Sequence, residues 1–442
     1  MVSTWATGNY TWNDIYLADF SVRFDGSSDF GSKQRWAPFF SGGLGVNIHN
    51  YEFLKGNEMV NKLKVRASYG RTGKASFPSY AATTMYEALF DEWYATGFGA
   101  VLKALGNNNL SWEKTDKFNV GIEMQFLNRR LTVDADYYHD KTIDLVNDVS
   151  LSQTSGFSSY KDNMGEVLNQ GFELQVRGEV FRNRDWLVAL WGNMAHNKNK
   201  IVKISDSQRA YNLRVEQFYQ NSANEEYGRY NAQYAVPISQ YEEGQSLTSI
   251  WAVKSLGIDP TTGKEIFLNR DGSVSDTWNA TQEVVVGNTE PKFNGSVGFN
   301  LAYKAWSLFA AFQYEWGGQE YNQTLVDRVE NARIQYQNVD LRVLTDRWKQ
   351  PGDIAQFKDI KNADNVTMPT SRFVQDKAYL RLSALTLSYD FNREWIKKHL
   401  GMNMLRLEAS TRDFINWNSI RQERGLSYPK SWTVDFSIKA QF

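Results

Sequence analysis

The sequence of 442 residues contains no cysteine and only eight prolines, and its formal net charge is −1. Without cysteine the chain has no disulfide framework and no thiolate metal site. A charge so close to zero gives no electrostatic footprint for nucleic acid. No apolar run approaches the roughly 18 residues of a membrane-spanning helix. The first residues, "MVSTWATGNYTWND", lack the basic start and apolar centre of a signal peptide.

Aromatic residues are abundant, with 15 Trp, 23 Tyr and 26 Phe, although the mean hydropathy is only −0.53. Disordered chains are poor in aromatic residues, so this composition indicates a folded protein. Apolar and polar residues alternate strictly in several segments, including "LTVDADY" at 131–137 and "WTVDFSIKAQF" at 432–442. Alternation with a period of two predicts β-strands that have one apolar and one polar face.

The alternation predicts about twelve long strands. They lie near 9–24, 36–48, 61–72, 112–126, 131–146, 166–180, 185–200, 291–303, 305–317, 379–391, 402–415 and 429–442. The short connection "YKAW" predicts a tight hairpin at 303–306. A shift of the apolar phase near 380–389 predicts a β-bulge, and "REWIKKHLG" predicts one helical turn.

The connections between these strands differ greatly in length. The short ones are 126–130, 181–185 and 303–306; the long ones lie near 73–111, 147–165, 201–290 and 318–378. If the strands run up and down, all the long loops fall at one end. This asymmetry, with strands longer than the usual 5–6 residues and aromatic residues near their ends, favours an all-β, antiparallel transmembrane β-barrel. A soluble β domain whose apolar faces form a core is the alternative.

No catalytic constellation stands out, and we expect neither an enzyme nor a cofactor or metal site. His49, His139, His196 and His399 have no metal-ligand spacing. Asp134 and Asp136 are interpreted as residues that line a polar lumen rather than as an acid/base pair. The function is therefore expected in the long loops. Four aromatic residues in or beside these loops are candidates for substrate contact: Trp251, Trp278, Trp316 and Tyr321. Their faces can stack on sugars or pack on peptides, and they can equally pack on a partner protein.

Several long motifs follow one another in an order that resembles a known family. They include "LKVRASYGRTG", "NMGEVLNQGFELQVRGEV", "GNTEPKFNGSVGFNLAYKAWSLFAAFQYEWGGQEYN" and "YLRLSALTLSY". Nearly the whole chain resembles the C-terminal part of the SusC-like TonB-dependent outer-membrane transporters of Bacteroidota. The segments 73–77 and 416–430 depart from the family pattern.

The resemblance implies a barrel of roughly 22 strands with a plugged lumen. Since about twelve strands are predicted, we expect about ten strands and the plug to be absent, and Met1 to be either an internal start or the boundary of a fragment. An open, curved sheet with free edges at 9–24 and 429–442 should result.

The resemblance also implies import of oligosaccharides or oligopeptides through the outer membrane. The implied partners are a SusD-like surface lipoprotein, TonB through an upstream region, outer-membrane lipid and the substrate. A passive porin or an adhesive surface β-protein is the alternative function. A secreted carbohydrate-active enzyme is a third, but it would need a carboxylate pair for which the sequence offers no candidate.

Overall fold

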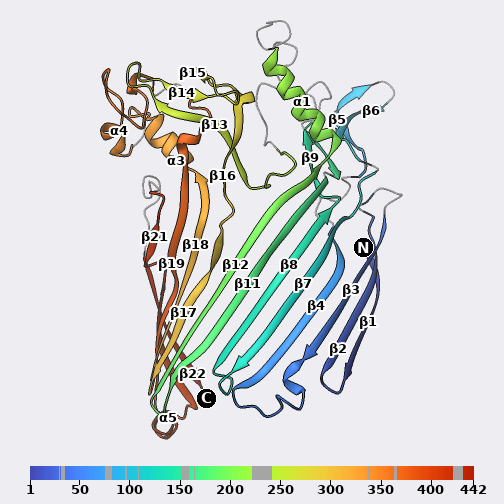
Figure 1. Ribbon diagram of the computed structural model, residues 1–442, viewed down its shortest axis with the longest axis vertical. Helices are drawn as coiled ribbons and strands as arrows, with labels where there is room; N and C mark the ends of the chain where they lie inside the picture. Colours follow the sequence, from blue (N-terminus) through green and yellow to red (C-terminus); the bar gives the residue numbers. More distant parts are fainter. Residues whose placement is uncertain are drawn as a thin grey trace.

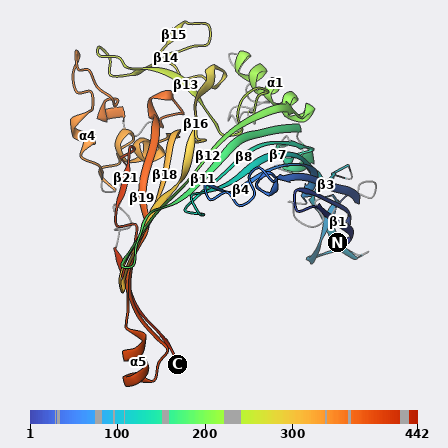
Figure 2. The same ribbon diagram turned by 60° about the horizontal axis from the view of Figure 1, so that its bottom comes forward.

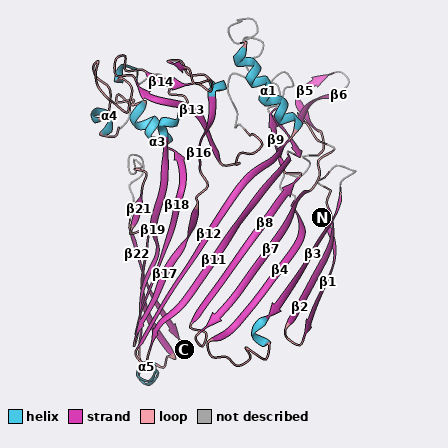
Figure 3. Ribbon diagram, in the orientation of Figure 1, coloured by secondary structure: helices cyan, strands magenta, loops and turns pink. Residues whose placement is uncertain are grey.

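The computed structural model describes most of the chain. The described residues are 1–28, 30, 35–74, 82–94, 97–107, 109–150, 159–163, 165–221, 241–336, 339–362, 366–421 and 432–442. They form one large antiparallel sheet of long, tilted strands, with smaller elements gathered at one end (Figure 1). Helices are few and lie at the two ends of the sheet (Figure 3). No helix among the described residues is both long and apolar enough to cross a membrane.

The large sheet has 14 strands, of which all but β21 (Asn416–Asn418) follow one another in hydrogen-bonded order. That path runs through β1 (Val2–Trp12), β2 (Tyr16–Gly26), β3 (Trp36–Asn47), β4 (Val60–Lys74), β7 (Glu113–Phe126), β8 (Leu131–Ile143), β11 (Gly165–Arg182), β12 (Trp186–Ile204), β17 (Phe293–Tyr303), β18 (Trp306–Tyr321), β19 (Val374–Asp390), β20 (Met404–Arg412) and β22 (Thr433–Gln441). Eleven of the twelve predicted strands are thereby confirmed, with ends shifted by a few residues. β21 pairs with β19 beyond the end of β20.

The strand predicted at 9–24 is wrong, because the chain reverses in its middle. β1 and β2 form a hairpin in which Trp12 pairs with Tyr16. Asn13 and Asp14 make the turn with φ of 53° and 56°. Asn and Asp tolerate this left-handed conformation, and two such residues in sequence suit the tight turn of a β-hairpin.

The sheet is open and strongly curved (Figure 2). Its outer strands are β1 and β22, and the described residues show no pairing between them. The open sheet and the edge at the last strand are as predicted. The other free edge belongs to β1 rather than to a strand at 9–24.

The two local predictions in the C-terminal region are confirmed. The register between β18 and β19 shifts between Ala311 and Phe312, which leaves Ser383 as the extra residue of a bulge. The Ser383 hydroxyl donates to the Ala311 carbonyl oxygen at 3.0 Å. The predicted helical turn is α5 (Arg393–Leu400), capped by the Asn392 side chain and ended by Gly401 with φ of 69°.

Most of the smaller elements lie at the end of the sheet where the long connections are (Figure 1). The strands there are β5 (Met85–Tyr94), β6 (Gly97–Ala104), β9 (Val146–Ser150), β10 (Ser159–Asn163), β13 (Ser249–Ile258), β14 (Glu265–Leu268), β15 (Val274–Ser275) and β16 (Glu283–Asn288). The helices there are α1 (Asp206–Gln220), α3 (Gln323–Leu325), η4 (Ala280–Gln282), η5 (Val326–Glu330), α4 (Arg342–Thr345), η6 (Ile360–Asn362) and η7 (Ser371–Phe373). The opposite end carries short turns, α5 and η1 (Ile48–Asn50).

The two faces of the large sheet differ in chemistry. Several large apolar side chains of the strands are exposed, including Val120, Phe172, Leu190, Val297 and Leu387. Register pairs such as Tyr137 with Phe172 and Leu301 with Leu308 place apolar residues together on this face. We call it the apolar face; the opposite, polar face carries most of the charged and amide groups of the strands.

Candidate functional site on the polar face and the cap

Ion pairs join the strands to one another across the polar face. Lys62 of β4 lies 2.5 Å from Glu123 of β7, and Arg66 lies 2.6 Å from Asp136 of β8. Arg66 reaches β8 across Gly121, where an added Cβ would lie 2.3 Å from the Asp136 carboxylate. Asp134 and Asp136 thus lie on the polar face, as the sequence interpretation expected, and Asp136 is an ion-pair partner.

A cavity of about 580 Å³ lies further along the same face. Residues of β8, β11, β12, β17, β18 and β19 line this cavity. Its polar lining residues are Asp134, Asp136, Glu173, Gln175, Asn193, Asn294, Ser296, Gln313, Tyr314, Glu315 and Tyr379. Carboxylate, amide and hydroxyl groups offer both hydrogen-bond donors and acceptors. This lining suits a hydrogen-bonding ligand such as a sugar or a peptide.

The polar face also carries an aromatic pair that the sequence analysis missed. Trp191 of β12 and Phe309 of β18 stack with ring centroids 6.2 Å apart and planes 11° apart. Gly298 of β17 lies between them, and a Cβ there would approach the Trp191 ring to 2.4 Å. Flat aromatic rings are surfaces on which sugars stack and peptides pack. Both residues follow the polar parity of their strands, which is the signal that could have marked them.

At the long-loop end, segments from two long connections pack into one unit, which we call the cap. It consists of the described residues within 249–288 and 322–373, and its strands form a sheet in the order β15-β14-β13-β16. Within this sheet β13 and β14 form an antiparallel hairpin. The core of the cap is an apolar cluster of Leu325, Val326, Val329, Ala332, Val343, Phe357 and Phe373.

Arg372 joins the two segments of the cap. Its guanidinium lies 2.8 Å from the Glu265 carboxylate and 2.7 Å from that of Glu330, whose side chain is fully buried. The guanidinium also lies 4.4 Å from the centroid of the Phe373 ring. Burial lowers the pKa of Arg372, but the hydrogen bonds to Glu265 and Glu330 outweigh it, so the pKa is raised overall. Arg372 is therefore a permanently charged bridge between the segments.

The structure distributes the four aromatic candidates over the cap and its base. Trp278 donates its indole N–H to the Pro369 carbonyl oxygen at 3.0 Å, which ties the two cap segments together. Trp251 lies in β13 and pairs with Val285 of β16. Tyr321 packs edge-on against Phe373, with ring centroids 6.0 Å apart. Trp316 is 69% exposed and lines a second cavity below the cap. The four side chains do not converge on one described cavity.

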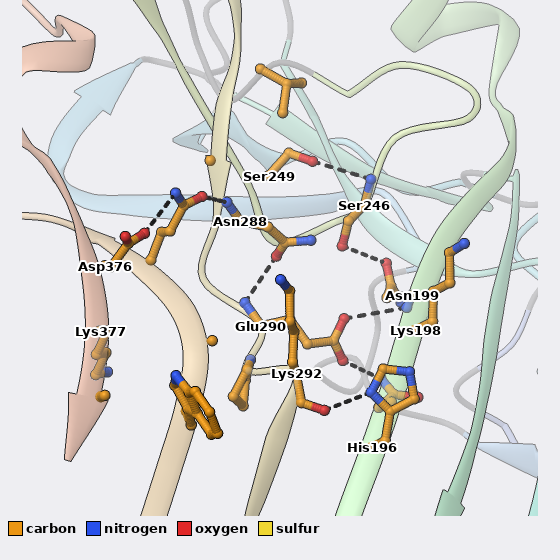
Figure 4. A pocket seen from close by; sticks show the side chains of 18 of the residues that line it. His196, Lys198, Asn199, Ser246, Ser249, Asn288, Glu290, Lys292, Asp376 and Lys377 are labelled. Atoms are coloured by element: carbon orange, nitrogen blue, oxygen red, sulfur yellow. Dashed lines mark hydrogen bonds between the residues drawn. The ribbon is translucent and has the colours of Figure 1, made fainter.

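This second cavity has a volume of about 680 Å³ and lies where β17 begins between β12 and β18 (Figure 4). The Glu290 carboxylate accepts hydrogen bonds from the Asn197 side chain and, at 3.2 Å, from the backbone N–H of Asn199. The Asn199 side chain in turn accepts from Ser246 at 3.3 Å. Glu290 therefore anchors the entry of β17 to β12 and fixes this wall of the cavity.

Tyr138 of β8 supports the same anchor from two strands away. Its hydroxyl donates to the Asn197 side-chain oxygen at 2.9 Å, and its ring crosses Gly171 of β11 to get there. A search of the described residues finds no group of three or more metal-binding side chains. The arrangement on both faces and in the cap is thus one of hydrogen bonds, ion pairs and aromatic contacts.

Comparison with known proteins gives consistent results. The family model for "TonB dependent receptor-like, beta-barrel" matches residues 2–410. TonB-dependent receptor P3 of Formosa agariphila is 27% identical over 438 residues, which cover 94% of this chain and 41% of the relative. TonB-dependent receptor SusC of Bacteroides thetaiotaomicron is 33% identical over 215 residues, covering 46% of this chain and 21% of SusC.

Solved structures show the same fold. A chain of the RagAB peptide transporter superposes with a TM-score of 0.78 at 24% identity, covering 95% of this chain and 44% of that one. The chain therefore spans less than half the length of the relatives and the structure that it matches.

Proposed function

The chain belongs to the TonB-dependent receptor β-barrel family, and from this premise we propose that it forms wall and cap of an importer for oligosaccharides or oligopeptides. Family membership places it in the outer membrane, as a SusC-like transporter barrel rather than an enzyme. The proposed step is passage of the substrate along the polar face. The apolar face contacts lipid.

The observation that supports this proposal is the cavity on the polar face. Its carboxylate, amide and hydroxyl groups hydrogen-bond a hydrated solute, and the Trp191–Phe309 pair on the same face adds a stacking surface. RagAB, whose fold this chain shares, is a peptide transporter, which favours oligopeptides as one substrate class. Oligosaccharides are the other class, because sugars use the same two kinds of contact.

The proposed partners follow from the same family. A SusD-like surface lipoprotein would cover the long-loop end, where the cap lies. TonB would drive import through a part of the receptor outside the described residues. Trp251, Trp278, Trp316 and Tyr321 stay proposed as substrate or partner contacts, with Trp316 the most accessible of the four.

The test is energised uptake by cells that carry the whole receptor. We expect uptake of labelled oligopeptides or oligosaccharides to stop when the receptor gene is deleted and when a protonophore collapses the proton gradient. Uptake that continues without the gradient would instead favour the passive porin.

A pair of variants tests the role of the polar face. Trp191→Ala should reduce uptake severalfold, since it removes the stacking surface. Leu190→Ala, on the adjacent residue of the same strand but on the apolar face, should leave uptake near normal. Receptor amounts in the outer membrane are compared by immunoblot. Equal uptake by both variants would contradict a substrate path along the polar face.

A further inference from the structure

Three lysines lie close to the cavity below the cap. A group of aromatic residues on the apolar face lies next to them, further from the long-loop end. Lys198 and Lys200 lie on β12, and Lys292 directly precedes β17. All three are exposed, and Lys198 and Lys292 line the cavity. We call these three residues the lysine shelf. Its position relative to the membrane can be worked out from its neighbours.

The neighbours of the lysine shelf mark the edge of the lipid-contacting band. His196 packs between Phe172 and Phe293, with ring centroids 5.4 Å and 5.6 Å away. Trp316, in register with Phe293, extends this aromatic row to β18 and is largely exposed. Aromatic rows of this kind mark the boundary between hydrocarbon and headgroups on membrane barrels.

The lysine shelf lies on the headgroup side of that boundary. Lys198 and Lys200 follow His196 by two and four residues on the same face, and β12 runs toward the long-loop end (Figure 1). With a rise of about 3.3 Å per residue and a tilt of about 45°, they lie about 5 and 10 Å beyond the aromatic row. Lys292 precedes Phe293 on a strand that runs the opposite way, so it lies on the headgroup side of the boundary as well. Its side chain follows the polar parity of β17, and it joins the lysine shelf at the cavity that Lys198 also lines.

The charges of the lysine shelf are not neutralised by the protein. Within the described parts of the chain, Lys198, Lys200 and Lys292 form no ion pair. Lys377, which also lines the cavity, is different because it lies 3.6 Å from Glu315 and 3.2 Å from Glu320. Of the two acidic lining residues, Glu290 is held by Asn197 and Asn199 on the other face of β12. Asp376 accepts a hydrogen bond from Gln319 at 3.1 Å. The shelf thus keeps an excess of positive charge.

We propose that the lysine shelf and Trp316 bind the phosphate-bearing headgroup of a lipid in the leaflet on the long-loop side. The ammonium groups contact the phosphate, and the indole packs on the start of the acyl chains, since Trp has an apolar body and a polar edge. The cavity of about 680 Å³ accommodates part of the sugar or glycerol that carries the phosphate. Lys198, Lys200 and Trp316 face lipid, and the cavity next to them shares no lining residue with the cavity of about 580 Å³ proposed for the substrate.

The test uses the whole receptor, purified in detergent, with diphosphorylated lipid A as the probe in native mass spectrometry. The triple variant Lys198→Gln, Lys200→Gln, Lys292→Gln should bind lipid A about tenfold more weakly, since each lysine near a membrane surface contributes measurably to anionic-lipid binding. Lys55→Gln, Lys397→Gln, Lys398→Gln removes three exposed lysines at the opposite end and should bind like the wild type. An equal loss of lipid A binding in both triple variants would refute a binding site at the lysine shelf.

Two further probes identify the source of the phosphate. Lipid A stripped of phosphate should bind the wild type as weakly as intact lipid A binds the shelf variant. Millimolar inorganic phosphate should not displace bound lipid A. Displacement by inorganic phosphate alone would show a site for soluble anions and overturn the lipid assignment. Because binding is measured without transport, failure here leaves the proposed import untouched, and loss of uptake leaves this site untouched.

Discussion

At the scale of single residues, an introduced arginine should have different effects on stability on the two faces of the β17–β18 hairpin. Phe299 and Phe312 follow the apolar parity, and Asn300 and Gln313 follow the polar parity. Arg at Phe299 or Phe312 should cost about 2–4 kcal/mol if the residue lies near the bilayer midplane, because the charge enters hydrocarbon. Arg at Asn300 or Gln313 should be mild. Unfolding by urea in lipid vesicles measures the four free energies, and equal damage at all four would argue for a soluble core.

Gly171 allows a second test at this scale. A Cβ there would lie 2.6 Å from the Tyr138 hydroxyl and would also press on the His196 carbonyl. Gly171→Ala should therefore destabilise the sheet by about 1–3 kcal/mol through overpacking. Gly178→Ala in the same strand is the control, since its added Cβ would lie 3.7 Å from the Leu131 side chain. Similar unfolding curves for the two variants would show that the close approach of the His196 carbonyl and the Tyr138 ring to Gly171 is unimportant.

At the scale of elements, the cap should depend on Arg372. Arg372→Ala leaves the buried Glu330 carboxylate without this partner, and breaking one side of a buried ion pair typically costs about 3–5 kcal/mol. We expect faster proteolysis within 322–373. Lys264→Ala removes an exposed pair with Asp276 in the same cap and should change little. Limited proteolysis of the purified receptor compares them, and equal cleavage rates would contradict the bridge.

Glu283, the first residue of β16, should make the cap sensitive to pH. Burial raises the pKa of its carboxyl from 4.5 to about 7. Between these values the folded cap holds a proton that the unfolded chain releases, so stability is greatest below pH 4.5 and falls as pH rises to about 7. Glu283→Gln, which mimics the protonated form, should remove this fall. The rate of proteolysis of the cap, measured across about pH 5–8, tests this prediction. If the Glu283→Gln variant kept the pH profile of the wild type, another group would be responsible for the pH dependence.

At the scale of the whole molecule, the proposed topology places the cap outside the cell and α5 in the periplasm. The 442 residues contain no cysteine, so single cysteines can report each side. A membrane-impermeant maleimide applied to intact cells should label Thr261→Cys in the cap. It should reach Lys398→Cys in α5 only after the outer membrane is opened. The reverse pattern would invert the topology.

The sequence was informative where a single period governs the structure. Alternation located eleven strands of the sheet, because a strand with two different faces repeats every two residues. Alternation gave a wrong strand at 9–24, because Asn13 and Asp14 form a turn in the middle of an otherwise continuous pattern. It also missed Trp191 and Phe309, since apolar residues on the polar parity look like noise. The packing of the two cap segments against each other could not be predicted, because Arg372 meets Glu265 and Glu330, which lie 107 and 42 positions earlier in the sequence.

The short turns at one end of the sheet have a consequence for the order of assembly. Closing a loop costs more entropy as the loop lengthens. Hairpins such as β7–β8, β11–β12 and β17–β18 can therefore form first, because each of them closes only a short turn. Joining β12 to β17 must wait, because the chain between them has to close across 205–292 and dock Glu290 against Asn197. We expect this seam to be the last of the described pairings to form, and its closure to set the folding rate of the sheet.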